Sequence, residues 1–238
     1  MVSLLMMIKA LIMFKAIIFD CDGTLVDSEH CHYLSWQHAL SKWNIPLAEE
    51  DYFFYVGKSG QAISRTMCEQ FELNSSEELL HDKRRIYDDF LKERKVPSIE
   101  RTLRFVRTLI SKKKELGLKL GVASAAPKEE IMVNLNFLGI AEDFDVIVSG
   151  KDDLDSYNDP EGVNKPKPYI YLHAAKLLGV DPAECIAFED SASGVTAARK
   201  AGMFTVALPN RFTEQHDFSQ ANLIIGQKQE IDLEELFK

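Results

Sequence analysis

Two aspartates separated by one residue follow an apolar segment near the start of the chain. Asp20 and Asp22 flank Cys21 and precede Gly23, at the end of a run over 15–20 that predicts a buried strand. Alternate side chains of an extended segment share a face, and a glycine lets the backbone turn close to a ligand. One carboxylate can then attack an electrophile while the other moves protons. Asp-Gly is also common in solvated turns, so this pair alone leaves both interpretations open.

A second acidic pair, Glu189 and Asp190, also follows an apolar run. Carboxylates gathered at one edge of a sheet repel one another unless a cation lies between them, and Mg²⁺ prefers oxygen ligands. The two pairs therefore predict a magnesium site. Asp190 or Ser191 is also suited to cap the helix expected next, and both roles are compatible.

Two further residues have the chemistry to bind a phosphoryl group. Ser124 ends the apolar run 118–123, and its hydroxyl and the amides after it suit an anion, although Ser124 would serve equally as a helix cap. Lys165 follows a polar, aspartate-rich loop over 151–164 and precedes Pro166. A lysine beside a proline can place one positive charge at an anion, but a solvated loop lysine is the commoner case.

The elements that must position these residues alternate between strands and helices. Apolar strands are expected at 15–20, 118–123, 145–149, 185–188, 204–208 and 223–225, with helical segments over 99–116, 127–138, 168–178 and 193–201 between them. This pattern predicts an α/β fold with a Rossmann-like, three-layer core around a parallel sheet. Ligands of such sheets bind beyond the carboxyl ends of the strands, where the four groups above fall.

The segment 28–96 interrupts the alternation. It contains helical patterns over 28–43, 61–71 and 76–95 and no convincing strand. We therefore expect two domains: an α/β core formed by 1–27 and 97–238, and an all-helical cap formed by 28–96.

The net charge and the cysteines of the chain limit the partners and sites that are expected. The net charge of −9 argues against nucleic acid or an anionic membrane as a default partner, and requires a local cation wherever a phosphorylated metabolite binds. Four scattered cysteines without a CxxC pair argue against zinc and indicate free thiols in a reducing cytoplasm. The apolar start, 1–14, lacks a clear cleavage site; we interpret residues 1–12 as a start-site extension, with Met13 as an alternative start.

Four motifs in order resemble those of the haloacid dehalogenase superfamily. The match consists of Asp20-Cys21-Asp22-Gly23-Thr24, Ser124 after its strand, Lys165-Pro166-Lys167-Pro168, and Glu189-Asp190-Ser191-Ala192-Ser193-Gly194-Val195. It is similar in particular to the branch that includes β-phosphoglucomutase and many sugar-phosphate phosphatases, whose helical cap follows the first motif.

The resemblance implies a role for each motif residue. It makes Asp20 the nucleophile that forms an aspartyl-phosphate, and Asp22 the general acid/base whose carbonyl also binds Mg²⁺. It implies that Ser124 and Lys165 hold the phosphoryl group, that Asp190 ligates the metal and that Glu189 supports the metal site. The resemblance also places three residues beside the substrate: Gly23, Thr24 and Ala125.

The cap residues bear on the substrate. Val56-Gly57-Lys58-Ser59 resembles the specificity loop of that branch, and His32 and Lys83 fall near cap residues of the mutase. The mutase has an arginine three residues after the loop glycine, where this chain has Gly60. Solvated lysines and a partly buried helix histidine are the alternative interpretations for the cap residues.

The sequence thus predicts a cytoplasmic, Mg²⁺-dependent phosphatase of a small phosphorylated metabolite, a sugar phosphate in particular, that is a monomer or a dimer. The alternatives are a β-phosphoglucomutase-type isomerase, a phosphonatase-like hydrolase with Lys58 as Schiff base, and a phosphate-ligand sensor without turnover. The complete set of motif residues argues against the sensor.

Overall fold

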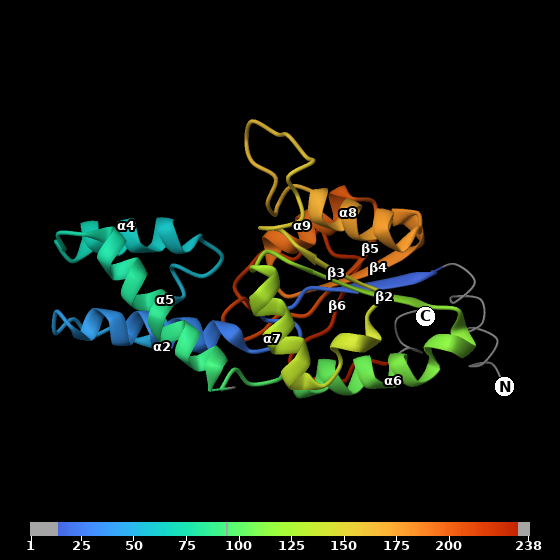
Figure 1. Cartoon of the computed structure of the whole chain (residues 1–238), viewed down its shortest axis with the longest axis horizontal. Helices are drawn as coiled ribbons and strands as arrows, with labels where there is room; N and C mark the ends of the chain where they lie inside the picture. Colours follow the sequence, from blue (N-terminus) through green and yellow to red (C-terminus); the bar gives the residue numbers. More distant parts are fainter. Residues whose placement is uncertain (1–13, 94, 233–238) are drawn as a thin grey trace. The chain divides into compact units, whose positions relative to one another are not determined.

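The computed structural model describes residues 14–93 and 95–232. Our interpretation of 1–12 as an extension lies outside the described residues. The chain divides into two compact units, one formed by 1–26 and 98–238 and the other by 27–97. The larger unit contains the sheet and the smaller unit is helical (Figure 1).

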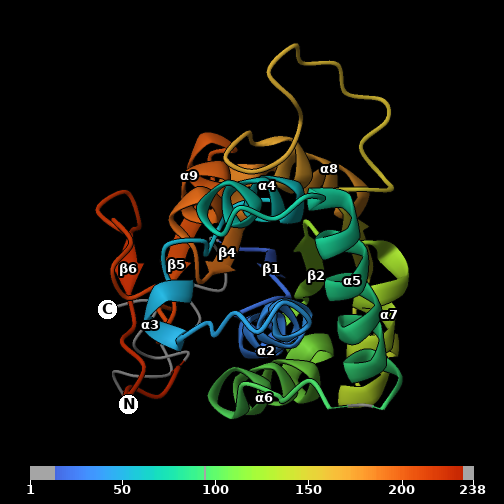
Figure 2. The ribbon, with the colours of Figure 1, turned by 90° about the vertical axis from the view of Figure 1, so that its left-hand side faces the viewer.

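A six-stranded parallel sheet forms the centre of the larger unit. Its strands lie in the order β3-β2-β1-β4-β5-β6, and most of this order can be followed across Figure 2. The strands are β1 (Ala16–Phe19), β2 (Lys119–Ser124), β3 (Val146–Ser149), β4 (Cys185–Glu189), β5 (Phe204–Ala207) and β6 (Leu223–Ile224). The prediction of a parallel α/β sheet is confirmed.

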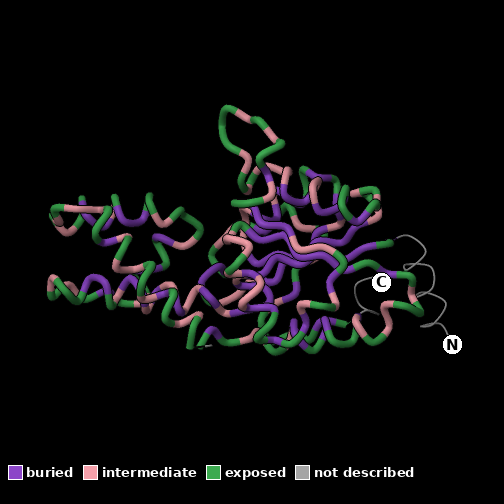
Figure 3. Tube along the Cα trace, viewed as in Figure 1, coloured by how far each residue is buried: buried purple, intermediate pink, exposed green. Residues whose placement is uncertain are grey.

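Helices cover both faces of this sheet, which makes three layers. The helices α8 (Tyr169–Leu178) and α9 (Ala192–Lys200) cover one face, and α6 (Glu100–Leu116) and α7 (Lys128–Leu138) cover the other (Figure 1). Two short 3₁₀ helices, η1 (Ala141–Asp143) and η2 (Pro182–Glu184), precede β3 and β4. The central strands β1, β2 and β4 are almost continuously buried, as expected when both faces are covered (Figure 3).

The side chains of β1 show how the strand alternation divides the core. Ala16 and Ile18 pack in the cluster that includes α8 and α9, whereas Phe19 lies within 6.3 Å of Phe105 on α6, measured between ring centroids. Because alternate side chains of a strand share a face, Asp20 follows Ile18 toward the α8 side. The carboxylate of Asp20, directly after β1, thus lies on the face of the sheet that α8 covers, where Lys165 is also found.

The smaller unit contains the helices α2 (Ser28–Ser41), α3 (Glu49–Tyr52), α4 (Gly60–Gln70) and α5 (Ser76–Lys92). Trp36 and Leu40 of α2, Met67 of α4 and Leu79 of α5 are all at most 1 % exposed and form its apolar interior. Short helix α3 was not predicted, because a four-residue helix shows no periodicity. No helix among residues 14–93 and 95–232 is long and apolar enough to cross a membrane.

Candidate active site

The turn after β1 brings the first motif against the fourth. Gly23 has a φ of +77°, a value that favours glycine, and a Cβ at this position would lie 2.1 Å from Asp190 Oδ2. The turn is closed by the Gly23 amide, which donates to the Val26 carbonyl at 2.8 Å. Glycine is therefore required here, because the backbone approaches a buried carboxylate directly.

Lys165 joins two of the candidate carboxylates. Its ammonium lies 2.6 Å from Asp20 Oδ1 and 2.6 Å from Glu189 Oε1, and it also donates to the Ala123 carbonyl at 3.2 Å. The side chains of Lys165 and Asp20 are 9 % and 7 % exposed, and that of Glu189 is fully buried. This geometry favours the site interpretation of Lys165 over that of a solvated loop lysine.

Burial dominates the electrostatics of Asp20. Burial is the largest influence on the pKa of the Asp20 carboxyl, the neighbouring Lys165 ammonium lowers this pKa, and Glu189 and Asp22 raise it; together they bring it to about 8. Burial by itself lowers the pKa of Lys165, but the charges and hydrogen bonds of Asp20 and Glu189 outweigh it and hold this pKa above its ordinary value, so Lys165 stays protonated. One ammonium is therefore not enough to keep all the neighbouring carboxyl groups ionised, and Asp20 favours its protonated form.

A divalent cation fits this deficit. Asp20, Glu189 and Asp190 each present one carboxylate oxygen within 4.8 Å of the others, a donor set of hard oxygens. Asp22 Oδ1 is also buried without a hydrogen-bond partner among the described residues. The residues present therefore suit Mg²⁺, with Asp20 and Asp190 as ligands; the two oxygens of Glu189 already accept hydrogen bonds from Lys165 and Ser191.

Ser124 contacts the other aspartate of the first motif. Its hydroxyl donates to Asp22 Oδ2 at 2.9 Å and accepts from the Ala126 amide at 3.1 Å. Ser124 is not the cap of α7, whose first amide, that of Lys128, donates instead to Asp152 Oδ2 at 2.7 Å. The Ser124 hydroxyl is thus directed at Asp22, the residue that we expected to act as general acid/base.

Two different residues of the fourth motif fill the two roles expected for it, helix cap and site carboxylate. Ser191 caps α9, because its hydroxyl accepts from the Gly194 amide at 3.1 Å, and Asp190 is left for the site. Asp190 is 7 % exposed and its Oδ2 accepts from Asn210 Nδ2 at 2.8 Å. Asp190 therefore stands at the site with its orientation set by a neighbouring amide.

Asn210 was missed by sequence reasoning. Its side-chain amide also donates to the Gly23 carbonyl at 3.4 Å, so it links the first and fourth motifs. Its position immediately after Pro209, beyond the end of β5, was the available signal, because strand ends of a parallel sheet converge on one edge.

The remaining core residues differ in exposure. Thr24 is fully buried and its hydroxyl has no partner among residues 14–93 and 95–232, whereas Ala125 is exposed. Cys21 is fully buried, and this burial raises the pKa of its thiol well above the ordinary value. A protonated, buried thiol is no nucleophile.

The helical unit contains a separate cluster around His32. Lys83 Nζ lies 2.9 Å from His32 Nδ1, and the His32 ring centroid lies 4.0 Å from that of Tyr87. Burial, and then the Lys83 charge, lower the pKa of His32 well below its usual value. Because an ammonium only donates, the neutral imidazole accepts at Nδ1 and carries its proton on Nε2.

The expected specificity loop shows a different environment. Gly57 has a φ of +84°, and Lys58 is exposed with its ammonium 3.5 Å from the centroid of the Phe54 ring. Phe54 is itself 64 % exposed. His32 and Lys83 are thus brought together within the helical unit, whereas Lys58 stacks on an exposed aromatic ring.

Comparison with known proteins agrees with this geometry. A family model described as haloacid dehalogenase-like hydrolase matches residues 14–202. The β-phosphoglucomutase of Bacillus subtilis is 31 % identical over 231 residues, which cover 92 % of this chain and 92 % of that protein. A phosphorylated carbohydrates phosphatase of Thermotoga maritima is 31 % identical over 194 residues, covering 79 % of this chain and 82 % of that protein.

A solved structure extends the likeness to three dimensions. The crystal structure of β-phosphoglucomutase from Clostridium difficile superposes with a TM-score of 0.65 and is 30 % identical, covering 90 % of this chain and 91 % of that one. The resemblance predicted from four motifs therefore extends over most of the chain.

Proposed function

Since the chain belongs to the haloacid dehalogenase-like hydrolases and is a phosphoric monoester hydrolase, we propose that it releases phosphate from a small sugar phosphate with the help of Mg²⁺. The observation that carries this proposal is the buried contact of Lys165 with Asp20 beside the cluster of carboxylates. A nucleophilic carboxylate held against one ammonium is suited to accept a phosphoryl group whose negative charge the ammonium balances.

The first step transfers the phosphoryl group to Asp20. A carboxylate oxygen of Asp20 attacks phosphorus in line with the ester oxygen, and the bond between phosphorus and that oxygen breaks. The bonding electrons pass to the leaving sugar oxygen, which takes a proton from Asp22. Lys165 balances the charge on the transferring oxygens, and the deeply buried setting strengthens that interaction.

The second step returns the enzyme to its starting state. A water molecule gives a proton to Asp22 and attacks phosphorus, the bond to Asp20 breaks, and inorganic phosphate leaves. The Ser124 hydroxyl would donate a hydrogen bond to the bound phosphoryl group. This requires that its present hydrogen bond to Asp22 breaks. Substrate binding would therefore also free Asp22 for proton transfer.

Mg²⁺ bound by Asp20, Asp190 and the Asp22 carbonyl would supply the positive charge that shields the nucleophile from the phosphate oxygens. In its absence the burial of Asp20 favours the protonated carboxyl. Asn210 would keep Asp190 oriented for the metal, and Gly23, which has no side chain, would leave room for the Asp190 carboxylate.

A phosphosugar isomerase of the β-phosphoglucomutase type is the second candidate. The observation in its favour is the His32 and Lys83 pair of the helical unit, whose polar groups suit a sugar phosphate. Gly60 in place of the arginine of the mutase loop favours the phosphatase. The phosphonatase alternative has less support, because exposed Lys58 lacks the desolvation that makes a lysine nucleophilic.

The test is a screen of phosphorylated sugars with released phosphate as the signal. We expect turnover that EDTA abolishes and that Asp20→Asn reduces by roughly a thousandfold or more, as for loss of a covalent nucleophile. For each active hexose phosphate, a coupled assay compares the rate of 1- to 6-phosphate interconversion with the rate of phosphate release. Faster interconversion would identify the isomerase; no phosphate release from any ester would refute the hydrolase.

A further inference from the structure

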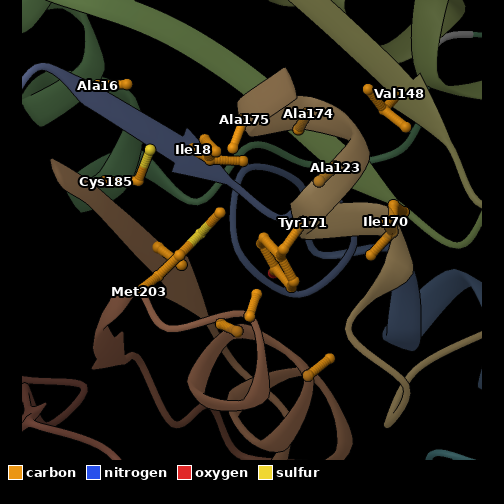
Figure 4. Packing of buried hydrophobic residues seen from close by; sticks show 14 of the residues in the cluster. Ala16, Ile18, Ala123, Val148, Ile170, Tyr171, Ala174, Ala175, Cys185 and Met203 are labelled. Atoms are coloured by element: carbon orange, nitrogen blue, oxygen red, sulfur yellow. The ribbon is translucent and has the colours of Figure 1, made fainter. Parts of the chain in front are cut away.

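Tyr171 of α8 lies in the apolar layer between α8 and the sheet. It is fully buried, and its neighbours in this cluster include Ile18, Ala123, Ile170 and Ala174 (Figure 4). A phenylalanine would fill the same volume against these side chains. A buried hydroxyl group is unfavourable unless it forms a hydrogen bond, so the oxygen of Tyr171 requires a separate explanation.

The hydroxyl ends at the candidate active site. It donates to Glu189 Oε1 at 2.5 Å, the same oxygen that accepts from Lys165 Nζ at 2.6 Å. The Lys165 ammonium lies 5.2 Å from the centroid of the Tyr171 ring. Tyr171 therefore touches both the carboxylate and, through its ring, the ammonium that this carboxylate holds.

The other side of the Glu189 carboxylate is also fixed. Ser191 Oγ donates to Glu189 Oε2 at 3.2 Å. A Cβ at Gly194 would lie 1.9 Å from the carboxyl carbon of Glu189, so the carboxylate packs directly against the first turn of α9. With Tyr171 on one oxygen and Ser191 on the other, the carboxylate is held in one orientation.

Tyr171 remains a donor under ordinary conditions. Burial first, and then the charge of Glu189, raise the pKa of its hydroxyl well above the usual value. A hydrogen bond from a neutral hydroxyl to a carboxylate is stronger than one between neutral groups. The contact is therefore suited to fix the position of Glu189 rather than to exchange protons.

We propose that Tyr171 is a positioning residue for the phosphoryl-transfer reaction: its hydroxyl fixes Glu189, and Glu189 in turn holds the Lys165 ammonium against Asp20. The inference rests on the proposed function, because Lys165 is the group that faces the transferring phosphoryl. In this proposal Glu189 orients the Lys165 ammonium. The hydroxyl of Tyr171 supports the reaction, whereas its ring serves the packing.

The test removes one oxygen atom, in Tyr171→Phe. The matched control is Tyr169→Phe on the same helix, whose hydroxyl donates to a carboxylate away from the site, Asp159 Oδ2, at 2.9 Å. We expect kcat of Tyr171→Phe to fall roughly tenfold while KM changes about twofold or less, because a misplaced ammonium weakens the transition state most. The control should keep the kcat of the unaltered enzyme.

Two equilibrium measurements separate this role from a structural one. Isothermal titration with Mg²⁺ alone should give the same Kd for both variants, since the hydroxyl acts through Glu189 on Lys165, whereas Asp20 and Asp190 are the expected ligands of the metal. Titration with orthovanadate at saturating Mg²⁺ should show roughly tenfold weaker binding to Tyr171→Phe only, because vanadate adopts the trigonal bipyramidal geometry of the transferring group. The vanadate arm does not depend on turnover.

The outcomes are distinct. If the unaltered protein hydrolyses no ester but the vanadate difference is present, the proposed function fails and the positioning role stands. Equal kcat and equal vanadate affinity in both variants would overturn the positioning role alone. A Tyr171→Phe protein that does not fold, or one with weaker Mg²⁺ binding, would overturn it as well, because the hydroxyl would then act on stability or on the metal site.

Discussion

Replacement of Lys165 by methionine tests the charge balance of the site. Methionine keeps most of the length of the side chain and removes the ammonium that lies 2.6 Å from both Asp20 and Glu189. In EDTA the variant therefore contains buried carboxylates with no ammonium between them. We expect the folded state to lose stability, and we expect Mg²⁺ to restore much of it.

The magnitude follows from the burial of the three groups. Removing one partner from a buried ion pair typically costs about 3–5 kcal/mol, because the remaining charge is left desolvated. The side chains here are at most 9 % exposed, so little solvent screening reduces this figure. For a protein of this size such a loss corresponds to a midpoint of thermal unfolding lower by roughly 10 °C.

The loss should also depend on pH. Burial raises the pKa of Asp20 to about 8, and Lys165 opposes that rise, so the variant binds the Asp20 proton more strongly. A folded state that binds more protons than the unfolded state loses stability as pH increases. The difference between the unaltered protein and Lys165→Met should therefore be larger at pH 8 than at pH 5.

The assay is urea denaturation at both pH values, with EDTA and with excess Mg²⁺. Lys42→Met is a suitable control, since Lys42 forms exposed ion pairs in the helical unit and such pairs contribute little to stability. Equal stability of Lys165→Met and the unaltered protein in EDTA at pH 8 would refute the reasoning, since it would show that the carboxylates need no cation. A loss that Mg²⁺ does not reduce would refute the proposed metal position.

Three further predictions concern the same site. Asn210→Ala should raise the Mg²⁺ concentration for half-maximal activity by about 10–100-fold, because Asp190 loses the amide that orients it; an unchanged value would remove Asn210 from the metal site. Ser124→Ala should reduce kcat/KM by roughly tenfold or more while the far-ultraviolet circular dichroism spectrum stays unchanged, since only one hydroxyl near Asp22 is lost; full kcat/KM would exclude Ser124 from phosphoryl binding. The unaltered protein in EDTA should lose stability as pH rises from about 4 to 8, the interval between the unfolded and folded pKa of Asp20, and Mg²⁺ should suppress this trend; a flat profile in urea titrations would contradict it.

The sheet was predictable because its signal is local. Each strand is a short apolar run followed by a polar residue, and the parallel arrangement buries both faces of such runs. Most helix boundaries were predicted to within three residues, since Gly117, Gly139 and Gly179 each follow the last helical turn in a left-handed conformation. The order of the strands was not predicted, because it depends on tertiary contacts between segments far apart in the sequence.

The candidate site shows the same division. Asp20, Ser124, Lys165 and Asp190 stood out because each follows a predicted strand or a long polar loop at the edge where strand ends converge. Tyr171 looked like an ordinary apolar helix residue, and only its hydroxyl distance to Glu189 reveals another role. The sequence shows which side chains reach the edge of the sheet, and the contacts among them depend on the packing.

The most direct test of the account is to identify the atom that carries the phosphoryl group. Acid quenching during turnover, followed by borohydride reduction and peptide mass spectrometry, locates an acyl-phosphate by the alcohol that replaces it. We predict modification of Asp20 alone, lost in Asp20→Asn and absent without substrate. The account would be contradicted if turnover gave the reduced alcohol at another residue. It would also be contradicted if no residue were reduced under conditions where a known acyl-phosphate enzyme is.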